Sequence, residues 1–405
     1  MDPLPLILFS FTYLGMALGR IPGLKLDRTG FAILGAVAFL ATGEMSLEQA
    51  KEAVDAPTIV VLWGMMLLSV QYQMSGLYTA IGDRLAAAKS PRKLLAGTIV
   101  VAALLAAVLT NDVICFAMTP LVASAILRTR QDPLPYLLAL ACATNIGSAL
   151  TPIGNPQNIL ITQKMGLDFL PFVLACALPV ALSLGFLHFF LARQLRERDP
   201  NDAPPAEPAT PRVPLDRREA AKAIALTVAA IVLFLIPAIP APLTALAIAG
   251  VVLTSRRMHT RAMLALVDWQ MLALFAGLFI VVHGLEVSGW TDAASRGLDA
   301  CGADLSRPFV FIPAAVVLGN LVGNVPTVML LLPFLPSDAP TGHGLALAST
   351  FAGNAVLVGS VANIIVAEQA ERLGIRIGFA RHLRVGLPVT LVSLALALGA
   401  AILLW

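Results

Sequence analysis

Charged residues are scarce in this sequence, and their scarcity decides the class of protein. Asp, Glu, Lys and Arg make up 13% of the 405 residues, whereas 58% are hydrophobic. A soluble protein of this length would need far more polar surface, so the composition excludes a soluble globular domain and predicts a polytopic membrane protein. The net charge of +3 says little by itself, and we expect no nucleic-acid partner.

Several other features are missing, and each absence excludes a class of protein. The four cysteines (Cys115, Cys142, Cys176 and Cys301) lack paired spacing, which argues against a disulfide framework and a metal site. The alternating pattern of a β-barrel is absent, so the spans are expected to be α-helices. No His-Glu-x-x-His or Gly-x-Ser-x-Gly motif appears, so we expect no intramembrane hydrolase or other enzyme, and no cofactor.

The distribution of Lys and Arg predicts how the chain crosses the membrane. Apolar windows of about 20 residues, long enough to cross the hydrocarbon core as helices, recur along the sequence. If the N-terminus lies outside, the cytoplasmic segments hold 23 of the 27 Lys and Arg residues, and the exceptions are Lys51, Lys164, Arg296 and Arg307. This asymmetry predicts ten crossing helices, two re-entrant hairpins and both termini in the periplasm, in a cell inner membrane. The cytoplasmic loops are marked by Arg20, Lys25 and Arg28, by Arg84, Lys89, Arg92 and Lys93, by Arg128 and Arg130, by Arg256, Arg257 and Arg261, and by Arg372, Arg376, Arg381 and Arg384. The other seven lie in the segment between the two halves: Arg193, Arg196, Arg198, Arg212, Arg217, Arg218 and Lys222.

The two halves of the chain resemble each other at a fixed offset. "SGLYTAIGDRL" from Ser75 aligns with "SGWTDAASRGL" from Ser288, and the same offset aligns Asn111 with Asn324. The predicted topology makes the span at 57–74 run inward, whereas its counterpart runs outward. The repeats are therefore expected to be inverted, an arrangement typical of secondary transporters with a solute site near the membrane midplane.

A second pair of segments is less regular. "TNIGSALTPIGNPQNILI" matches "GNAVLVGSVANIIV", which aligns Asn145 with Asn354. The same match aligns Asn158 with Asn363 and leaves the second copy four residues shorter between its asparagines. The expected domains are a first repeat at 1–192 with a hairpin at 94–128 and a broken helix at 133–163, a cytoplasmic linker at 193–220, and a second repeat at 221–405 with a hairpin at 308–336 and a broken helix at 345–370.

Four segments interrupt apolar helix with Asn, Thr, Ser, Gly or Pro. In "TPIGNPQN", Pro152 and Pro156 remove backbone donors and Gly154 permits unusual backbone angles, so this stretch cannot be regular helix. Exposed N–H groups and carbonyls at half-helix ends can bind polar solutes or ions, and four converging ends would form a small polar site. The alternative is a set of ordinary kinks whose asparagines form hydrogen bonds between helices.

Asp112 stands in the middle of the apolar run "LTNDVICFAMTP", and the nearest charged residues are Lys93 and Arg128. An ionised group at the bilayer centre costs roughly 2.5–3.5 kcal/mol, so a residue of this kind usually has a use. One interpretation is a structural carboxylate bonded to a hairpin-tip N–H or a nearby Asn. The other is a proton or cation carrier, because apolar surroundings favour the neutral acid. The second half has no counterpart, since Val325 occupies the equivalent position.

The four interrupted segments together resemble the ion transporter superfamily, which includes arsenite permeases, sodium/proton antiporters, and citrate and divalent anion transporters. The tips Thr110-Asn111-Asp112 and Gly323-Asn324-Val325 depart from the Ser-Asn-Thr of divalent anion/sodium symporters and look more like the arsenite permease branch and related bacterial anion permeases. The resemblance implies a scaffold domain, a mobile transport domain with an elevator-like motion, and a homodimer. For the arsenite branch it also implies a soluble ATPase subunit as a partner.

We therefore predict a proton-coupled secondary transporter that exports a small inorganic solute, with arsenite or antimonite as the leading candidates. Arsenite is largely uncharged near neutral pH and presents hydroxyls that Asn, Thr and backbone carbonyls can bind. Asp112 would exchange a proton with the solute. The residues expected to line the solute site are Asn111, Thr151, Asn155, Asn158, Asn324, Thr327, Asn354 and Asn363.

Three other functions stay open. A sodium- or proton-coupled carboxylate or anion symporter is the second choice, although no Lys or Arg in the interrupted segments would offset a polyanion. A sodium/proton antiporter is the third, weakened by the single carboxylate at mid-membrane depth. A channel is also conceivable, but the two-fold organisation favours alternating access.

Overall fold

The chain is helical throughout the part that the structure describes. The structure is a computed structural model, and it describes residues 2–18, 26–88, 90–127, 131–195 and 213–404. Within these ranges the regular elements are α-helices and two short 3-10 helices, with no β-strand, so the all-α class is confirmed. The predicted cytoplasmic residues Arg20, Lys25, Lys89, Arg128 and Arg130, and most of the predicted linker, lie outside the described residues.

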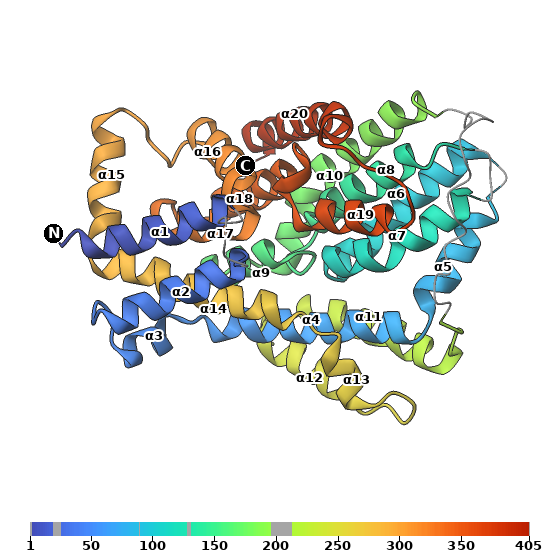
Figure 1. The fold of residues 1–405 in the computed structure, drawn as a ribbon, viewed down its shortest axis with the longest axis horizontal. Helices are drawn as coiled ribbons and strands as arrows, with labels where there is room; N and C mark the ends of the chain where they lie inside the picture. Colours follow the sequence, from blue (N-terminus) through green and yellow to red (C-terminus); the bar gives the residue numbers. More distant parts are fainter. Residues whose placement is uncertain (1, 19–25, 89, 128–130, 196–212, 405) are drawn as a thin grey trace.

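The helices follow the same order in each half of the chain (Figure 1). The first half contains α1 (Leu4–Leu18), α2 (Arg28–Ala41), α3 (Leu47–Ala53), α4 (Ala56–Met74), α5 (Leu77–Ala86), α6 (Pro91–Val108), α7 (Asn111–Leu127), α8 (Leu134–Ser148), α9 (Pro156–Met165) and α10 (Phe169–Ala192). The second half contains α11 (Arg217–Phe234), α12 (Ala241–Leu253), α13 (Thr260–Ala265), α14 (Trp269–Val287), α15 (Trp290–Ala300), α16 (Pro308–Val322), α17 (Asn324–Leu331), η1 (Leu332–Phe334), α18 (Ala339–Ala352), η2 (Leu357–Gly359), α19 (Val361–Glu371) and α20 (Phe379–Leu404).

Four of the described helices, α6, α10, α14 and α20, are long and apolar enough to cross a membrane. The pair α3 and α4 would be a fifth span, with a bend of 54° between the two helices. Most of the other apolar helices have only 10 to 17 residues, in keeping with helices that are interrupted inside the protein. The count of ten crossing helices therefore stays a prediction.

Local structure recurs at positions that the predicted offset makes equivalent. Helices α4 and α14 have equal lengths, and each begins at an aspartate, Asp55 or Asp268, whose side chain accepts the backbone N–H three residues later. Just after each helix ends, Gly76 and Gly289 adopt φ values of 73° and 77°, a conformation that glycine adopts without strain. The two copies thus share caps as well as sequence, whereas their opposite orientation in the membrane stays a prediction.

The helices pack into two groups, and each group draws on both halves of the chain. In the first group α2 packs on α14, and α12 packs on α4. In the second group α8 packs on α6, α18 packs on α16, and α10 packs on α20. Helices α5 and α15 connect the groups and stand at opposite ends of the molecule in Figure 1. We call these the scaffold group (α1–α4 and α11–α14) and the transport group (α6–α10 and α16–α20).

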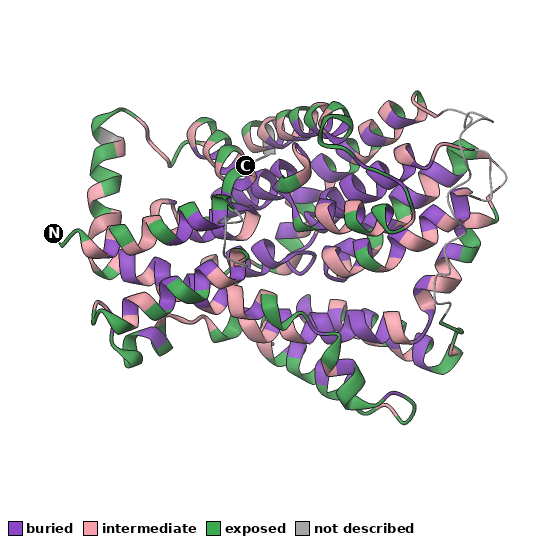
Figure 2. Cartoon of the chain, in the orientation of Figure 1, coloured by how far each residue is buried: buried purple, intermediate pink, exposed green. Residues whose placement is uncertain are grey.

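The centre of the transport group is formed by α8 and α18, which are buried along nearly their whole length (Figure 2). The peripheral helices instead expose large apolar side chains, such as Leu104 on α6, Leu174 on α10 and Leu391 on α20. Hydrocarbon can cover an apolar periphery of this kind, whereas water would not. The polar interrupted segments therefore lie in the interior, where frayed backbone at membrane depth is tolerated.

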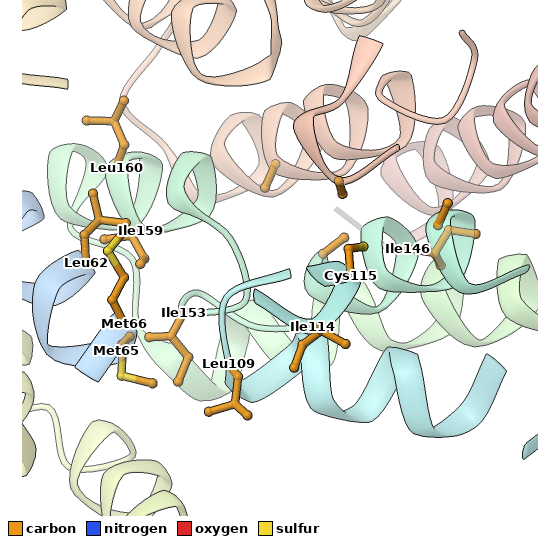
Figure 3. Packing of buried hydrophobic residues seen from close by; sticks show 14 of the residues in the cluster. Leu62, Met65, Met66, Leu109, Ile114, Cys115, Ile146, Ile153, Ile159 and Leu160 are labelled. Atoms are coloured by element: carbon orange, nitrogen blue, oxygen red, sulfur yellow. The ribbon is translucent and has the colours of Figure 1, made fainter. Parts of the chain in front are cut away.

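The two groups meet over an apolar surface. Figure 3 shows Leu62, Met65 and Met66 of α4 beside Ile153 and Ile159 of the first broken helix, and α4 packs on α9. Apolar contact is non-directional, but polar contacts also cross between the groups. The Tyr13 hydroxyl donates to the Pro326 carbonyl (3.1 Å), and the hydroxyls of Ser69 and Thr110 lie 3.4 Å apart.

Candidate functional site

The helices are interrupted at the four segments that the sequence marks, while the chain continues through each of them. Helices α6 and α7 are separated by residues 109–110, and α16 and α17 by Gly323 alone, which has a φ of 100°. Helices α8 and α9 are separated by residues 149–155, and α18 and α19 by residues 353–360 with η2 inside the break. Each half thus has one hairpin tip and one broken helix.

In each broken helix an asparagine side chain forms hydrogen bonds with two backbone carbonyls at the same spacing. The side-chain amide of Asn158 donates to the carbonyls of Ser148 (3.2 Å) and Thr151 (3.0 Å), ten and seven residues earlier. The amide of Asn363 donates to the carbonyl of Gly353 (2.7 Å), and also to the carbonyl seven residues before Asn363 (3.3 Å). The same spacing in both copies means that the broken helices are equivalent without a gap.

This equivalence corrects part of the predicted alignment. Asn158 with Asn363 is right, but Asn145 with Asn354 is wrong, because an ungapped alignment that keeps the first pair matches Asn145 with Thr350. The prediction matched asparagine to asparagine and introduced a gap that the structure does not contain.

Contacts between the broken helices are reciprocal under the corrected alignment. The Ser360 hydroxyl donates to Asn145 Oδ1 (3.1 Å), and the Asn155 amide donates to Thr350 Oγ1 (3.2 Å). Asn155 is equivalent to Ser360, and Asn145 to Thr350, so each bond is the counterpart of the other. A two-fold relation between the copies produces contacts of this kind.

Asn145 joins three of the predicted site residues, although it was not predicted to line the site itself. Its Nδ2 donates to Oδ1 of Asn354 (2.9 Å) and of Asn363 (3.2 Å). Its Oδ1 accepts from Asn111 Nδ2 (3.3 Å) as well as from Ser360. The first hairpin tip and the second broken helix are therefore tied together through one buried amide.

Some of the remaining predicted residues lie beside the residues that Asn145 joins, and the others contact different helices. A β-carbon built on Gly353 would lie 2.8 Å from Asn324 Nδ2, so the second hairpin tip abuts the second broken helix. Asn155 reaches α18 through Thr350. Thr151 donates to the Ala107 carbonyl of α6. Thr327 is fully buried on α17 and has no hydrogen bond to the other predicted residues among the described ones.

Several polar atoms of this region have no hydrogen-bond partner among the described residues, although they are buried. Buried polar atoms in native proteins are nearly always partnered, so a group of orphans marks a place where a ligand or water binds. The orphaned atoms of the predicted site residues are Asn111 Oδ1, Asn158 Oδ1, Asn324 Oδ1, Thr327 Oγ1 and Asn354 Nδ2. Most of them are acceptors, and they suit a solute that presents hydroxyl groups.

Asp112 lies in the first turn of α7 and is half-buried. Within the described part of the chain its carboxyl group makes no hydrogen bond and no ion pair. A structural carboxylate would be bonded to a tip N–H or an Asn, and no such bond is present in the described ranges. The role of Asp112 as a proton carrier stays a prediction.

His382 is a further neighbour of the site that sequence reasoning missed. It is buried on α20, and its Nε2 donates to the Asn354 carbonyl at 3.0 Å. His382 follows an arginine near a helix start, and nothing in the neighbouring sequence marks it as a site residue. Cys115 is fully buried near the same break and pairs with the Thr144 hydroxyl (3.1 Å).

A cavity of about 1090 Å³ opens between the two groups of helices, beside the second broken helix. From the scaffold group it is lined by the starts of α2 and α14, and from the transport group by the end of α16, η2 and α19. Its charged lining residues are Asp27, Asp268, Glu368, Glu371, Arg28 and Arg376. With four acidic and two basic side chains, the lining of the cavity carries a net negative charge.

The corresponding place in the first repeat holds a smaller cavity, of about 230 Å³, lined by α4, the first broken helix and the start of α12 among others. Lys164 at the end of α9 forms an ion pair with Asp55 (2.8 Å) at the start of α4, and its ammonium lies 5.6 Å from the Phe279 ring centroid. Burial raises the pKa of Asp55, but the hydrogen bonds from Lys164 and Thr58 together lower it by more, so the pKa of Asp55 is below its usual range. We call the Asp55–Lys164 pair the latch.

Comparison with known proteins gives one family and several relatives. The family described as "Citrate transporter" matches residues 13–346. A "Putative transporter arsB" of Dictyostelium discoideum is 24% identical, over 94% of this chain and 88% of that protein. The "Silicon efflux transporter LSI3" of Oryza sativa subsp. japonica is 28% identical, over 93% of each. The solved YdaH transporter of Alcanivorax borkumensis has the same fold, with a TM-score of 0.60 at 16% identity, over 98% of this chain and 96% of that one.

Proposed function

The chain belongs to the citrate transporter family, and from this premise we propose that it is a proton-coupled secondary transporter for a small, uncharged, hydroxylated inorganic solute. Arsenite or antimonite is the leading solute, and export is the proposed direction. The observation that carries the proposal is a set of buried polar atoms without a hydrogen-bond partner among the described residues: Asn111 Oδ1 and Asn354 Nδ2 belong to residues bonded to Asn145, and Asn324 Oδ1 lies at the second hairpin tip. Transport rather than catalysis accords with the family.

The charges around the site support an uncharged solute over a polyanion. The cavity that leads to the second broken helix has four acidic and two basic lining residues, and a negative potential repels a multiply charged anion. The names of two relatives, a putative arsB transporter and a silicon efflux transporter, point the same way. Trivalent arsenic and silicon both dissolve near neutral pH as small, uncharged molecules with hydroxyl groups.

A carboxylate or anion symporter is the second candidate, and the family's description favours it. Such a transporter would need the solute to pass the acidic cavity with its charges offset by sodium ions or protons. Sodium/proton antiport is the third candidate. The expected homodimer and the soluble ATPase partner stay predictions.

Flux through the purified protein in proteoliposomes tests the proposal. Under an imposed proton gradient we expect arsenite flux that stops when an ionophore collapses the gradient, and no effect of a sodium gradient. Citrate is expected neither to be transported nor to compete. Sodium-driven citrate uptake without arsenite flux would replace the proposal by the second candidate.

We also propose that the two groups of helices move past one another in an elevator-like way, and that this structure corresponds to the cytoplasm-open state. In the predicted topology the large cavity faces the cytoplasm and the latch faces the periplasm. Helix α9 is docked on α4, whereas the equivalent pair α19 and α14 is separated by the cavity. Exchanging these two arrangements would open the outer side and close the inner one.

Breaking the latch is expected to favour the periplasm-open state. Lys164 is 44% exposed and Asp55 13%, and a pair of this kind contributes about 0.2–1 kcal/mol. In a variant with Cys301→Ser and a reporter Ile153→Cys, Lys164→Gln should raise labelling by an impermeant thiol reagent from outside about two- to fivefold. Lys164→Arg, which keeps the positive charge, should retain the wild-type level, and Lys51→Gln, which breaks an exposed pair on α3, should not change it.

The latch also makes a prediction about pH. Because the pKa of Asp55 is lowered in this state, the latch holds at full strength above the usual pKa of the carboxyl and weakens only as the outside pH falls through the lowered value. Labelling of the reporter should therefore stay flat between about pH 5 and 8. A change within this window would mean that another group controls the opening.

A further inference from the structure

Arg28 places a positive charge at the tip of the second hairpin. It is the first residue of α2 and is half-buried. A β-carbon built on Gly323 would lie 3.2 Å from Arg28 Nη1, so the guanidinium rests against the single residue that separates α16 from α17. The interrupted segments themselves contain no Lys or Arg, and the scaffold group supplies one from a distant part of the chain.

This guanidinium has no counter-ion among the described residues. Arg28 makes no ion pair and no hydrogen bond there, although two aspartates line the same cavity. Asp27 instead accepts from the Gly30 N–H and from Gln270, and Asp268 caps α14. A half-buried cation without a partner is costly, so its position calls for a function.

Two helix ends add to the positive potential at the same tip. Arg28 stands at the N-terminus of α2, and Asn324 begins α17 on the other side of Gly323. Helix N-termini carry positive partial charge, so the guanidinium and both helix ends act with the same sign. The orphaned Oδ1 of Asn324 and Oγ1 of the fully buried Thr327 lie in the first turn of α17, where they can meet a solute hydroxyl.

We propose that Arg28 is a specificity-determining residue that excludes cations from the solute site, so that the acidic cavity and Arg28 together admit only uncharged, oxygen-rich solutes. The four cavity acids repel polyanions before they reach the tip, and Arg28 repels the cations that the acids attract. The proposal rests on the proposed function for the solute, and it argues against sodium/proton antiport.

Sodium entry into proteoliposomes tests this role without reference to the solute. The wild-type protein should admit no more radioactive sodium than protein-free vesicles. Arg28→Gln and the uncharged Arg28→Met should each admit at least about tenfold more sodium, because the positive charge of Arg28 no longer repels sodium ions that enter the cavity. Arg28→Lys keeps the charge and should behave like the wild type.

Arg376 provides the matched control, since it lines the same cavity but is 88% exposed and lies 3.9 Å from Glu371. Arg376→Gln should leave sodium exclusion unchanged. In parallel, sodium should inhibit arsenite flux in Arg28→Gln but not in the wild type. Sodium exclusion that survives in folded Arg28→Gln or Arg28→Met overturns the role of Arg28, whereas absent arsenite flux in the wild type overturns only the proposed function.

Discussion

Asp112→Asn is expected to reduce proton-driven solute flux to the level of protein-free vesicles while leaving the protein folded. Asn has nearly the same shape as Asp but cannot carry a proton in the relevant pH range. The carboxyl makes no hydrogen bond or ion pair within the described part of the chain, so no structural contact is lost. A half-buried acid of this kind is instead placed to gain and lose a proton as water reaches it from one side and then the other.

The measurement separates coupling from solute binding. Flux under an imposed proton gradient should vanish in Asp112→Asn, whereas exchange of labelled for unlabelled arsenite at equal concentrations, which needs no net proton movement, should persist in part. Asp83→Asn, on the exposed surface of α5, is the control and should retain wild-type flux. Wild-type dependence of flux on the proton gradient in Asp112→Asn would remove this residue from the coupling mechanism.

Features that depend on neighbouring residues could be predicted from the sequence. Apolar windows and polar interruptions are local signals, and they located the helical segments and the four breaks. The offset that aligns Ser75 with Ser288 also reflects local structure, because Asp55 and Asp268 both cap a helix. Such repeated caps are set by residues close in the chain.

The convergence of the interrupted segments could be predicted from the repeats, but the particular contacts between distant residues could not. Asn145 is a polar residue within α8, and nothing nearby in sequence indicates that Asn354 and Asn363 lie within its reach. Arg28 was interpreted only as a marker of the cytoplasmic side, since its contact with Gly323 joins opposite ends of the chain. The second repeat was misaligned for a related reason. The prediction matched asparagine to asparagine by residue type, whereas the equivalent asparagines are those whose side chains donate to carbonyls at the same spacing, Asn158 and Asn363.

Asn145→Ala is expected to abolish solute flux in every mode and to destabilise the transport group. The Asn145 side chain makes four hydrogen bonds, two as donor and two as acceptor, which is the full capacity of an amide. At the membrane average of about 0.6 kcal/mol for each bond, their loss corresponds to about 2 kcal/mol. The loss falls on Asn111, Asn354 and Asn363, which are the residues proposed to hold the solute.

Thr350→Val is the matched control, because Thr350 occupies the equivalent position in the second half but its hydroxyl accepts, among the described residues, from Asn155 and Gln157 alone. Reversible unfolding in mixed micelles should show a loss for Asn145→Ala about twice that for Thr350→Val, since twice as many bonds are removed. Exchange of labelled arsenite should also be lost in Asn145→Ala, in contrast to Asp112→Asn, because positioning of the solute fails and not only its coupling to protons. Equal stability of Asn145→Ala and the wild type, together with undiminished exchange, would show that the cluster around this amide neither holds the broken helices together nor forms the site.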